Sequence, residues 1–478
     1  MEERREKCGV FAALADYHVA TTIYSGLVAL QHRGQESAGI ATFDGREIRL
    51  HRGMGLVGEV FSQKNLQYLL GKSGIGHVRY STTGSSLFEN AQPLYFQAPK
   101  MGIAIAFNGN IVNFDSLKEK LEDSGHVFTS TTDTEAIAHL FADELAEKKP
   151  LFEAMKNVMA KLVGAYSVVI LTDRGKIIAC RDPHGFKPLC IGKKNSLHII
   201  ASESCALDVL DAEFVREVEP GEVVLLSSRG IESKRVCPAG RHAHCMFEYV
   251  YFSRRDSVIE GKNVYEVRQR LGEALAKKHS LKVDMVVPIP DSGRSAAAGY
   301  SRKSGIPIVE ALNKNRYVHR TFITPGDKGR QNAVRLKLNP IKALIQGKRV
   351  ALVDDSVVRG TTMTRLVELV RRTGAKEVHL LVSCPPVIAP CYMGVDFPTY
   401  KELAAANNSV EEMRKMMGLD SLNYQDIDGL IEAIGLPKED LCMACLTNQY
   451  PVPIGKQADA GVCGAKPQKV PQQPERRP

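Results

Sequence analysis

The chain has 478 residues, enough for two or three domains of about 150 residues each. Hydrophobic residues make up 44% of it and charged residues 24%, as in ordinary globular proteins. No apolar run reaches the roughly 18 residues of a membrane helix, and the charged residues 1–7 are unlike a secretory signal. We therefore expect a cytoplasmic protein without a membrane partner.

The net charge of +9 is spread along the chain, without a long basic run or a nucleic-acid-binding motif. Tryptophan is absent and aromatic residues are 6%, so platforms for base stacking are not favoured. The charge therefore favours a small acidic ligand over nucleic acid. The 11 cysteines are an odd number, and without an export signal they favour reduced thiols, a nucleophile or a metal site over disulfides.

The two halves of the chain predict different kinds of domain. The first half, to about residue 235, has short β-type segments separated by Gly-rich turns. In the second half, apolar strands adjoin polar or Gly-rich loops, and residues 361–375 have helical periodicity. Strand, loop, helix and strand form a βαβ unit, which implies a parallel sheet. The clearest predicted strands are 102–110, 166–173, 283–290, 349–355 and 377–384.

Cys8 is the first candidate for chemistry. A lone early cysteine is usually structural, but four motifs follow this one: QHRGQESAG (31–39), GHVRYST (76–82), FNGN (107–110) and TDTE (132–135). Together they resemble the glutaminase domain of the N-terminal-nucleophile (Ntn) amidotransferases, an α+β domain with αββα layers. In that family the cysteine thiolate attacks the glutamine amide, and the cysteine's own α-amine is the base. The resemblance therefore implies that residues 1–7 are a propeptide, removed between Lys7 and Cys8.

The same resemblance implies roles for five further residues. Taken alone, an Arg or Asp is usually a solvated surface residue, and Asn-Gly is above all a turn signal. By resemblance, the Asn108 side chain and the Gly109 N–H form an oxyanion hole in a turn. Glutamine binding is assigned to Arg79 for the α-carboxylate, Asp133 for the α-ammonium, and Arg33, whose role is less defined.

The segment VALVDDSVVRGTT (350–362) is the strongest single motif. An apolar strand runs into Asp354, Asp355 and Ser356, and Gly360, Thr361 and Thr362 then open a helix. Hydroxyls and backbone N–H groups at a helix N-terminus bind anions, and adjacent acids suit ribose hydroxyls and a divalent metal. A buried strand ending in a polar turn does not readily explain this combination. The segment resembles the phosphoribosyl pyrophosphate (PRPP) motif of the type I phosphoribosyltransferases, which have an α/β domain with a parallel sheet.

Two other segments agree with this resemblance. Asp291 and Ser292, in PDSGR (290–294), resemble the pyrophosphate loop of that family. The basic span 314–337, with Lys314 and Arg316, falls where the family has a lid over the substrate, although a charge run is usually only a solvated face. We expect PRPP to contact both segments as well as residues 354–362. One Mg²⁺ per subunit is expected at Ser292, Asp354 and Asp355.

Cys442 and Cys445 form a CxxC pair, for which zinc ligation, a redox pair and an iron–sulfur cluster are the competing interpretations. The chain resembles the iron–sulfur subclass of amidotransferases at two further positions, Cys245 and Cys391. That resemblance implies one [4Fe–4S] cluster per subunit, held by these four cysteines. Since the proposed chemistry transfers no electrons, we expect the cluster to be structural.

Taken together, the motifs resemble the amidophosphoribosyltransferases, in their propeptide-bearing, iron–sulfur subclass. The implied reaction converts glutamine, PRPP and water into 5-phosphoribosylamine, glutamate and pyrophosphate, the first committed step of purine (IMP) biosynthesis, with ammonia passing between two sites. The resemblance also implies inhibition by AMP, GMP or ADP and a homotetramer. The alternatives are another Ntn amidotransferase, disfavoured by DDSVVRGTT, and a non-catalytic nucleotide sensor, disfavoured by the complete glutaminase motifs.

These assignments divide the chain into four parts. Residues 1–7 are the propeptide and 8–235 the glutaminase domain. Residues 236–452 form the phosphoribosyltransferase domain with a C-terminal helical and iron–sulfur region. The remaining residues, 453–478, are rich in Pro, Gln and Lys, and we expect them to be a disordered tail.

Overall fold

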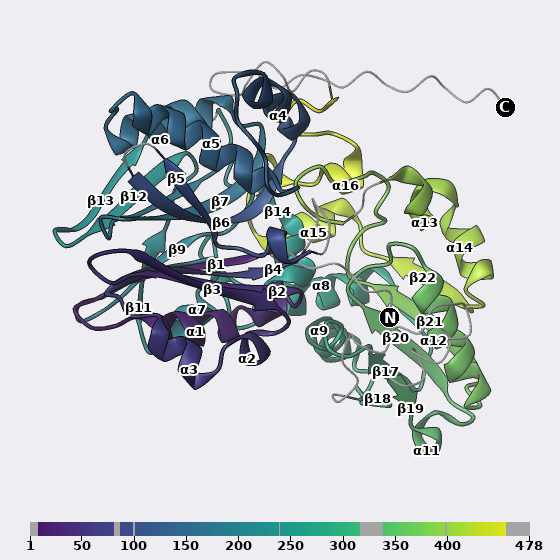
Figure 1. The fold of residues 1–478 in the computed structure, drawn as a ribbon. Helices are drawn as coiled ribbons and strands as arrows, with labels where there is room; N and C mark the ends of the chain where they lie inside the picture. Colours follow the sequence, from purple (N-terminus) through teal and green to yellow (C-terminus); the bar gives the residue numbers. More distant parts are fainter. Residues whose placement is uncertain are drawn as a thin grey trace.

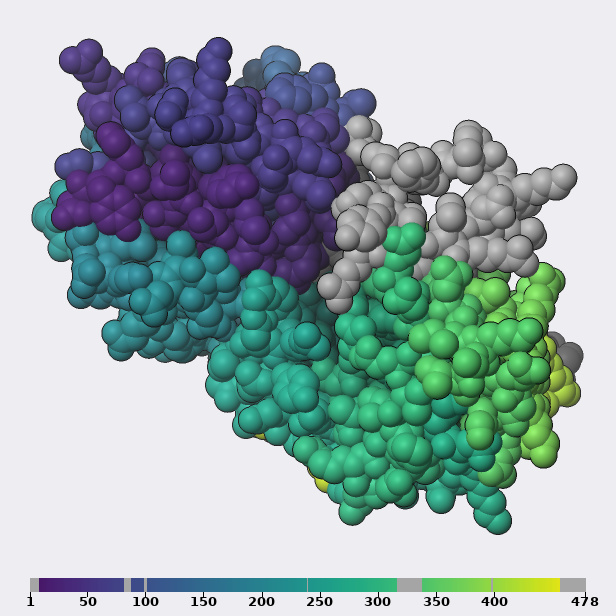
Figure 2. All heavy atoms as spheres, turned by 90° about the horizontal axis from the view of Figure 1, so that it is seen from below, coloured from purple at the N-terminus to yellow at the C-terminus, as the bar shows by residue number. Residues whose placement is uncertain are grey.

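A computed structural model describes residues 8–80, 87–98, 101–238, 240–315, 338–396 and 399–455. The predicted propeptide, most of the predicted lid and all but the first residues of the predicted tail lie outside these ranges. The chain forms two lobes, and Figure 2 shows the purple and blue N-terminal lobe meeting the green C-terminal lobe along teal segments. None of the described helices is long and apolar enough to cross a membrane.

The N-terminal lobe contains two antiparallel sheets. The seven-stranded sheet has the order β11-β9-β10-β1-β4-β2-β3, and the six-stranded sheet has the order β13-β12-β8-β7-β6-β5. The strands of the first are β1 (Gly9–Leu14), β2 (Ser37–Phe43), β3 (Ile48–Met54), β4 (Ser73–Arg79), β9 (Cys190–Lys194), β10 (Leu197–Ala201) and β11 (Glu213–Glu217). Those of the second are β5 (Leu94–Ala98), β6 (Met101–Ile111), β7 (Gly164–Thr172), β8 (Ile177–Arg181), β12 (Glu222–Ser227) and β13 (Gly230–Arg235).

Helices cover the outer face of each sheet, so the lobe has four layers (Figure 1). The alternation of β1 shows why: Phe11 and Ala13 pack toward α1, while Val10 and Ala12 enter the apolar layer between the sheets. The helices over the first sheet are α1 (Ala20–Ala29), α2 (Val57–Val60), α3 (Gln63–Tyr68) and α7 (Cys205–Asp208). Those over the second are α4 (Phe114–Asp123), α5 (Asp133–Ala146) and α6 (Leu151–Lys161).

The C-terminal lobe is built on a parallel sheet with the order β17-β20-β21-β22, as the βαβ pattern predicts. One face packs on α8 and α9 and the other on α12 and α14. The strands are β17 (Met285–Pro288), β20 (Arg349–Asp354), β21 (Glu377–Val382) and β22 (Ser421–Tyr424). The helices are α8 (Val264–Lys278), α9 (Arg294–Ser304), α12 (Thr361–Arg372), α14 (Val410–Met416) and α15 (Ile427–Ile434).

Small elements surround this sheet. Three short ladders pair β14 (His244–Cys245) with β23 (Leu441–Cys442), β15 (Val258–Ile259) with β16 (Lys262–Asn263), and β18 (Leu312–Lys314) with β19 (Leu338–Pro340). The short helices are η1 (Gln31–Arg33), η2 (Phe88–Asn90), η3 (Glu248–Phe252), α11 (Lys342–Ile345), η4 (Tyr400–Glu402), α13 (Ala404–Asn407), η5 (Lys438–Asp440) and α16 (Ala444–Thr447).

An apolar cluster joins the lobes. Val163, Ala165 and Phe186 of the N-terminal lobe pack with Ala243, Met393, Cys442, Ala444, Tyr450 and Val452 of the C-terminal lobe. The residues that follow the parallel sheet in sequence therefore return to the glutaminase-like lobe. This contact brings the predicted cluster cysteines close to the lobe boundary.

Candidate active sites

Cys8 lies immediately before β1, beside the end of β4. Its Sγ donates a hydrogen bond to the carbonyl of Tyr80 at 3.3 Å, and the Tyr80 N–H lies 3.4 Å from the same sulfur. Burial raises the pKa of the Cys8 thiol, although the Tyr80 backbone and Arg79 oppose this shift. The thiol is therefore protonated at neutral pH and requires a base before it can act as a nucleophile.

Arg79 and Asp133 lie within electrostatic reach of this thiol. Arg79 ends β4, is 2% exposed and pairs with Glu36. Asp133 begins α5 and accepts a hydrogen bond from the Ile111 N–H at 2.9 Å. Burial raises the pKa of Asp133 to about 6, despite opposing backbone N–H groups and Arg79. A cation and a carboxylate thus stand beside the thiol, as the recognition of an amino acid's two charged groups requires.

Asn108 belongs to β6, opposite Ser167 of β7, so the strand predicted at 102–110 is confirmed and the turn predicted at 107–110 was wrong. Strand β6 continues through Asn-Gly because the two strands approach closely: a Cβ on Gly109 would lie 2.0 Å from the Ala165 carbonyl oxygen. Among the described residues, neither amide atom of the buried Asn108 side chain has a hydrogen-bond partner. Burying an amide without a hydrogen-bond partner costs free energy of folding. Such a group marks a place where a bound ligand can supply the missing hydrogen bonds.

His77 and Gln92 hold the strand that carries Asn108. The Phe107 N–H donates to Gln92 Oε1 at 2.8 Å, and His77 Nε2 lies 2.9 Å from the Phe107 carbonyl. Burial lowers the pKa of His77 to about 3, so the neutral ring donates from Nε2. Sequence reasoning missed His77 and Glu36 as site residues, although both lie inside the motifs that identified the site.

Arg33 is 1% exposed and directs its donors at protein acceptors. Its Nε donates to the Cys8 carbonyl at 3.0 Å, and its remaining nitrogens bind Glu203 and Glu248. A guanidinium held in this way is not presented to a ligand. Sequence reasoning placed Arg33 at the site but did not identify Glu203, which lies in the segment ASESCALD (201–208).

The second site lies at the carboxyl end of β20. Asp354 and Asp355 are buried, the Asp355 N–H donates to Asp354 Oδ1 at 2.9 Å, and Ser356 Oγ donates to Asp355 Oδ2 at 2.7 Å. Gly360 has φ +80° and precedes α12, which begins with Thr361 and Thr362. The left-handed conformation turns the chain into the helix and favours glycine at this position.

Strand β17 brings the predicted pyrophosphate loop to the same edge. The Ile289 N–H donates to the Val353 carbonyl at 2.9 Å, and a Cβ on Gly293 would lie 2.2 Å from that oxygen. Asp291 and Ser292 follow β17 as Asp354 follows its neighbour β20, so both segments lie at the carboxyl ends of parallel strands. Lys314 Nζ donates to Asp291 Oδ2 at 2.5 Å. Arg316 lies outside the described residues.

The four predicted cluster cysteines gather at the boundary between the lobes. Cys245 and Cys442 are paired residues of the parallel β14–β23 ladder. Burial raises the pKa of the Cys445 thiol far above its ordinary value, and Cys391, Cys384, Cys442 and Cys245 are near enough to raise it further. In the part of the chain that the structure describes, no three His, Cys, Asp or Glu side chains form a group that could hold a metal ion.

Both sites correspond to known domains. Residues 77–209 match the glutamine amidotransferase domain, and residues 261–390 match the phosphoribosyl transferase domain. An amidophosphoribosyltransferase of Methanocaldococcus jannaschii is 51% identical over 94% of this chain and 98% of that protein. The chain belongs to the amidophosphoribosyltransferase family. A Bacillus subtilis member is 44% identical over 94% of this chain and 95% of its own length.

Solved structures of this family confirm the fold. Glutamine PRPP amidotransferase from B. subtilis, complexed with ADP and GMP, has a TM-score of 0.88 at 43% identity and covers 94% of this chain and 98% of its own. A structure described as the allosteric regulatory enzyme of purine biosynthesis has a TM-score of 0.89 at 42% identity, and the match covers 97% of this chain and 100% of that one.

The predicted αββα Ntn domain and type I phosphoribosyltransferase domain are thereby confirmed. The chain is an enzyme of the family that catalyses the first committed step of purine biosynthesis.

Asn108→Ala provides a test of the unpartnered amide. We expect the glutaminase kcat to fall about 10²- to 10³-fold, the usual effect of losing one oxyanion donor. The melting temperature should not fall, because no described hydrogen bond is lost with the side chain. Steady-state glutamate release and thermal unfolding measure the two effects, and a stable variant with wild-type kcat would contradict the assignment.

Proposed function

We propose that this chain uses glutamine, PRPP and water to form 5-phosphoribosylamine, glutamate and pyrophosphate, with ammonia passing between its two sites. The observation that carries the proposal is that one chain combines two arrangements. The first is a thiol flanked by Arg79 and Asp133, together with a buried Asn108 amide that has no described hydrogen-bond partner, and the second is an acid pair that precedes a helix N-terminus. The first arrangement suits the release of ammonia from glutamine, and the second suits its transfer to an activated ribose phosphate. A protein that catalysed only one of these half-reactions would not need both arrangements.

In the glutaminase half-reaction, Cys8 Sγ attacks the glutamine side-chain carbonyl carbon to form a thioester. The α-amine of Cys8 accepts the thiol proton and returns it to the departing ammonia, and water then hydrolyses the thioester to glutamate. The Asn108 amide and the Gly109 N–H stabilise the tetrahedral oxyanion. Arg79 binds the substrate carboxylate and Asp133 its ammonium group. Arg33 instead holds the Cys8 carbonyl through its Nε.

In the synthase half-reaction, the ammonia nitrogen attacks C1 of the ribose and pyrophosphate leaves with inversion. The N-terminus of α12, with Thr361 and Thr362, suits the 5-phosphate, and Asp354 and Asp355 suit the ribose hydroxyls. The loop with Asp291 and Ser292 suits the pyrophosphate, and Lys314, and by resemblance Arg316, supply counter-charge. The carboxylates of Asp354 and Asp355 with the Ser292 hydroxyl are suitable Mg²⁺ ligands, and bound Mg²⁺ would stabilise the leaving group. Mg²⁺ usually takes few protein ligands because substrate phosphates and water complete its shell.

Ammonia must reach the second site without escaping into water, where it would be protonated. The lobes touch next to the oxyanion hole: Asn110 Nδ2 donates to the Tyr392 carbonyl at 3.0 Å, and a Cβ on Gly394 would lie 3.2 Å from the Gly109 oxygen. The segment that follows Cys391 therefore closes the glutaminase site on the side of the second lobe. This contact supports direct transfer between the lobes.

Asp355→Asn separates the two half-reactions. We expect synthesis of phosphoribosylamine to fall at least about 10²-fold, since a charge that binds the ribose or the metal is removed. Glutamate release without PRPP should stay within about twofold of wild type, because Asp355 lies at the end of β20 and its side chain accepts a hydrogen bond from the neighbouring Ser356. Coupled assays of pyrophosphate and glutamate measure both rates, and equal loss of the two would argue against separate sites.

Residues 1–7 are proposed to be a propeptide, because the α-amine of Cys8 can act as a base only after the Lys7–Cys8 bond is cut. Active enzyme should therefore begin at Cys8. Intact-mass spectrometry of the purified enzyme, together with Edman sequencing, tests this prediction. Detection of Met1 or Glu2 in fully active enzyme would refute it.

The cysteine set supports a structural [4Fe–4S] cluster at Cys245, Cys391, Cys442 and Cys445. A single zinc ion, with Zn–S bonds of about 2.3 Å, draws its four sulfurs to within about 4 Å of one another, whereas a polynuclear cluster spaces its ligands more widely. The thiols gathered around Cys445, with Cys245 and Cys442 paired on one ladder, are compatible with the larger group. When bound, the cluster would cross-link β14, β23 and the Cys391 segment at the lobe boundary.

Cys442→Ser is expected to abolish the brown colour of the proposed iron–sulfur cluster, because one of its four ligands is removed. The melting temperature should also fall, because the cross-link through Cys442 is lost. Cys180→Ser, which changes a buried cysteine inside the N-terminal lobe, is the matched control and should keep its iron. Iron analysis and visible absorption measure the cluster. Full iron content in the Cys442 variant would exclude this ligand assignment.

The proposal for regulation comes from a relative. The B. subtilis structure holds ADP and GMP, and at 43% identity this supports purine nucleotides, AMP included, as inhibitors of this chain. We also propose a cytoplasmic homotetramer that binds neither nucleic acid nor membranes.

A further inference from the structure

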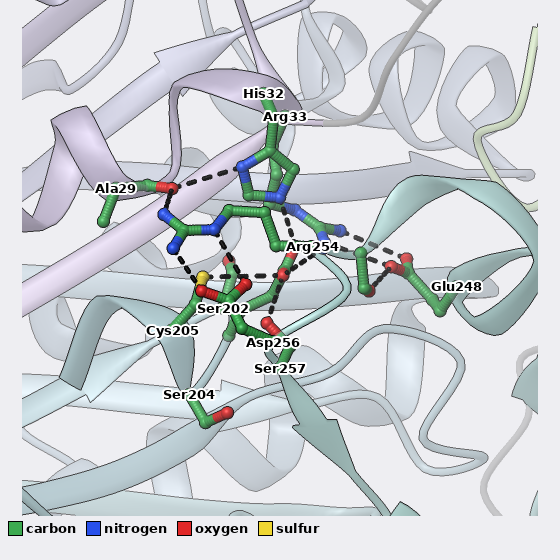
Figure 3. A network of polar contacts seen from close by, with 12 residues as sticks. Ala29, His32, Arg33, Ser202, Ser204, Cys205, Glu248, Arg254, Asp256 and Ser257 are labelled. Carbon is green, nitrogen blue, oxygen red and sulfur yellow. Dashed lines mark hydrogen bonds and ion pairs between the residues drawn. The ribbon is translucent and has the colours of Figure 1, made fainter. Parts of the chain in front are cut away.

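A buried ionic network lies where the lobes meet (Figure 3). Arg33 follows α1, Glu203 follows β10 and Glu248 begins η3. Arg33 Nη1 and Nη2 bind the two carboxylate oxygens of Glu248 at 3.1 Å each, and Nη1 also binds Glu203. All three side chains are buried. Glu203 and Glu248 take no part in the half-reactions described above.

Glu203 is the centre of this network. It accepts hydrogen bonds from the Arg254 N–H at 2.9 Å and from Ser257 Oγ at 2.7 Å, and His32 Nε2 lies 2.8 Å from its other oxygen. Burial alone would raise the pKa of Glu203, but His32 and Arg33 outweigh it and hold the pKa below its usual range. The carboxylate is therefore ionised at neutral pH and fixes one side of the Arg33 guanidinium.

The other side of Arg33 reaches the nucleophile. Its Nε donates to the Cys8 carbonyl at 3.0 Å, and this carbonyl is bonded to the carbon that carries both the α-amine and the thiol-bearing side chain. Holding the Cys8 carbonyl limits rotation about the Cα–C bond. It thereby sets where the amine and Sγ point relative to Asn108. Misplacement by about 1 Å can cost two orders of magnitude in rate.

We propose that Glu203 is a positioning residue for Cys8, acting through Arg33. This inference rests on the proposed glutaminase function, which it deepens: the residue that aligns the nucleophile lies in neither the thiol's own strand nor the oxyanion strand. Glu203 touches no substrate and is not a catalytic residue. Its effect is on the alignment and the charge environment of the Cys8 α-amine.

The second lobe takes part in this alignment. Arg254 and Ser257 belong to the segment between η3 and β15, and the Val258 N–H also donates to Ser204 Oγ at 2.8 Å. Arg268 of α8 braces the same segment through the Tyr249 and Ser253 carbonyls, at 2.7 and 2.8 Å. Two of the groups that hold the Glu203 carboxylate therefore come from outside the glutaminase sheets.

The test is the glutaminase activity of Glu203→Gln without PRPP. We expect kcat to fall about 10- to 100-fold, while KM for glutamine stays within about twofold because Arg79 and Asp133 are untouched. Glu203→Gln removes one of the negative charges that balance the Arg33 guanidinium. The positive charge of Arg33 then disfavours the ammonium form of the Cys8 α-amine more strongly than in the wild type. Its pKa should therefore fall, and the acid limb of the kcat/KM profile should move to lower pH.

Two further variants separate positioning from stability. Glu222→Gln removes another buried carboxylate, which Arg216 binds at 2.7 and 2.8 Å, and should lower stability without changing kcat or the pH profile. Glu203→Asp keeps the charge but shortens the side chain, so kcat should fall while the acid limb stays in place. Glu203→Asp also tests the proposal if the Glu203→Gln protein does not fold.

Wild-type kcat with an unshifted acid limb in Glu203→Gln would overturn the proposal, as would equal losses of kcat in Glu203→Gln and Glu222→Gln. Wild-type enzyme without glutaminase activity would instead refute the proposed function itself. Selective loss of kcat in both Glu203 variants, with the limb shifted in Glu203→Gln alone, is the result that supports the inference.

Discussion

The buried ion pairs of Arg33 are the interaction that constrains the segments around Cys8. The guanidinium binds Glu203 and Glu248, which lie far apart in the sequence, and the carbonyl of the nucleophile. Burying such charges is tolerated only when they are paired and hydrogen-bonded, and removal of one partner typically costs about 3–5 kcal/mol. The network therefore gives little net stability but allows few alternative arrangements of the segments that it joins.

The positions of the two candidate active sites depend on different properties of β-sheets. In the N-terminal lobe, two antiparallel sheets stack face to face. Cys8 lies where β1 begins and β4 ends, and Asn108 lies on β6 of the other sheet. In the C-terminal lobe, parallel strands place their carboxyl ends at one edge, so the acid pair of β20 lies beside the loop after β17. Ligand sites at such an edge are a general property of open parallel sheets.

The lobe contact affects chemistry as well as assembly. The segment after Cys391 packs on Gly109 and Asn110, next to the proposed oxyanion hole, and the same segment follows a proposed cluster ligand. The second lobe also supplies hydrogen bonds to Glu203. Parts of the chain that bind no glutamine therefore shape the site where glutamine reacts.

The sequence by itself determined the two domains, the parallel sheet, and the motifs of both sites, because these depend on local periodicity and on residue types at short spacing. It also predicted both a strand at 102–110 and an Asn-Gly turn at 107–110, and pairing with β7 holds the whole segment as a strand. The contacts of Glu203, Glu36 and His77 were decided only by the tertiary structure. Each acts through a partner distant in sequence, and local pattern carries no information about which buried charges and carbonyls will meet when sheets and lobes pack.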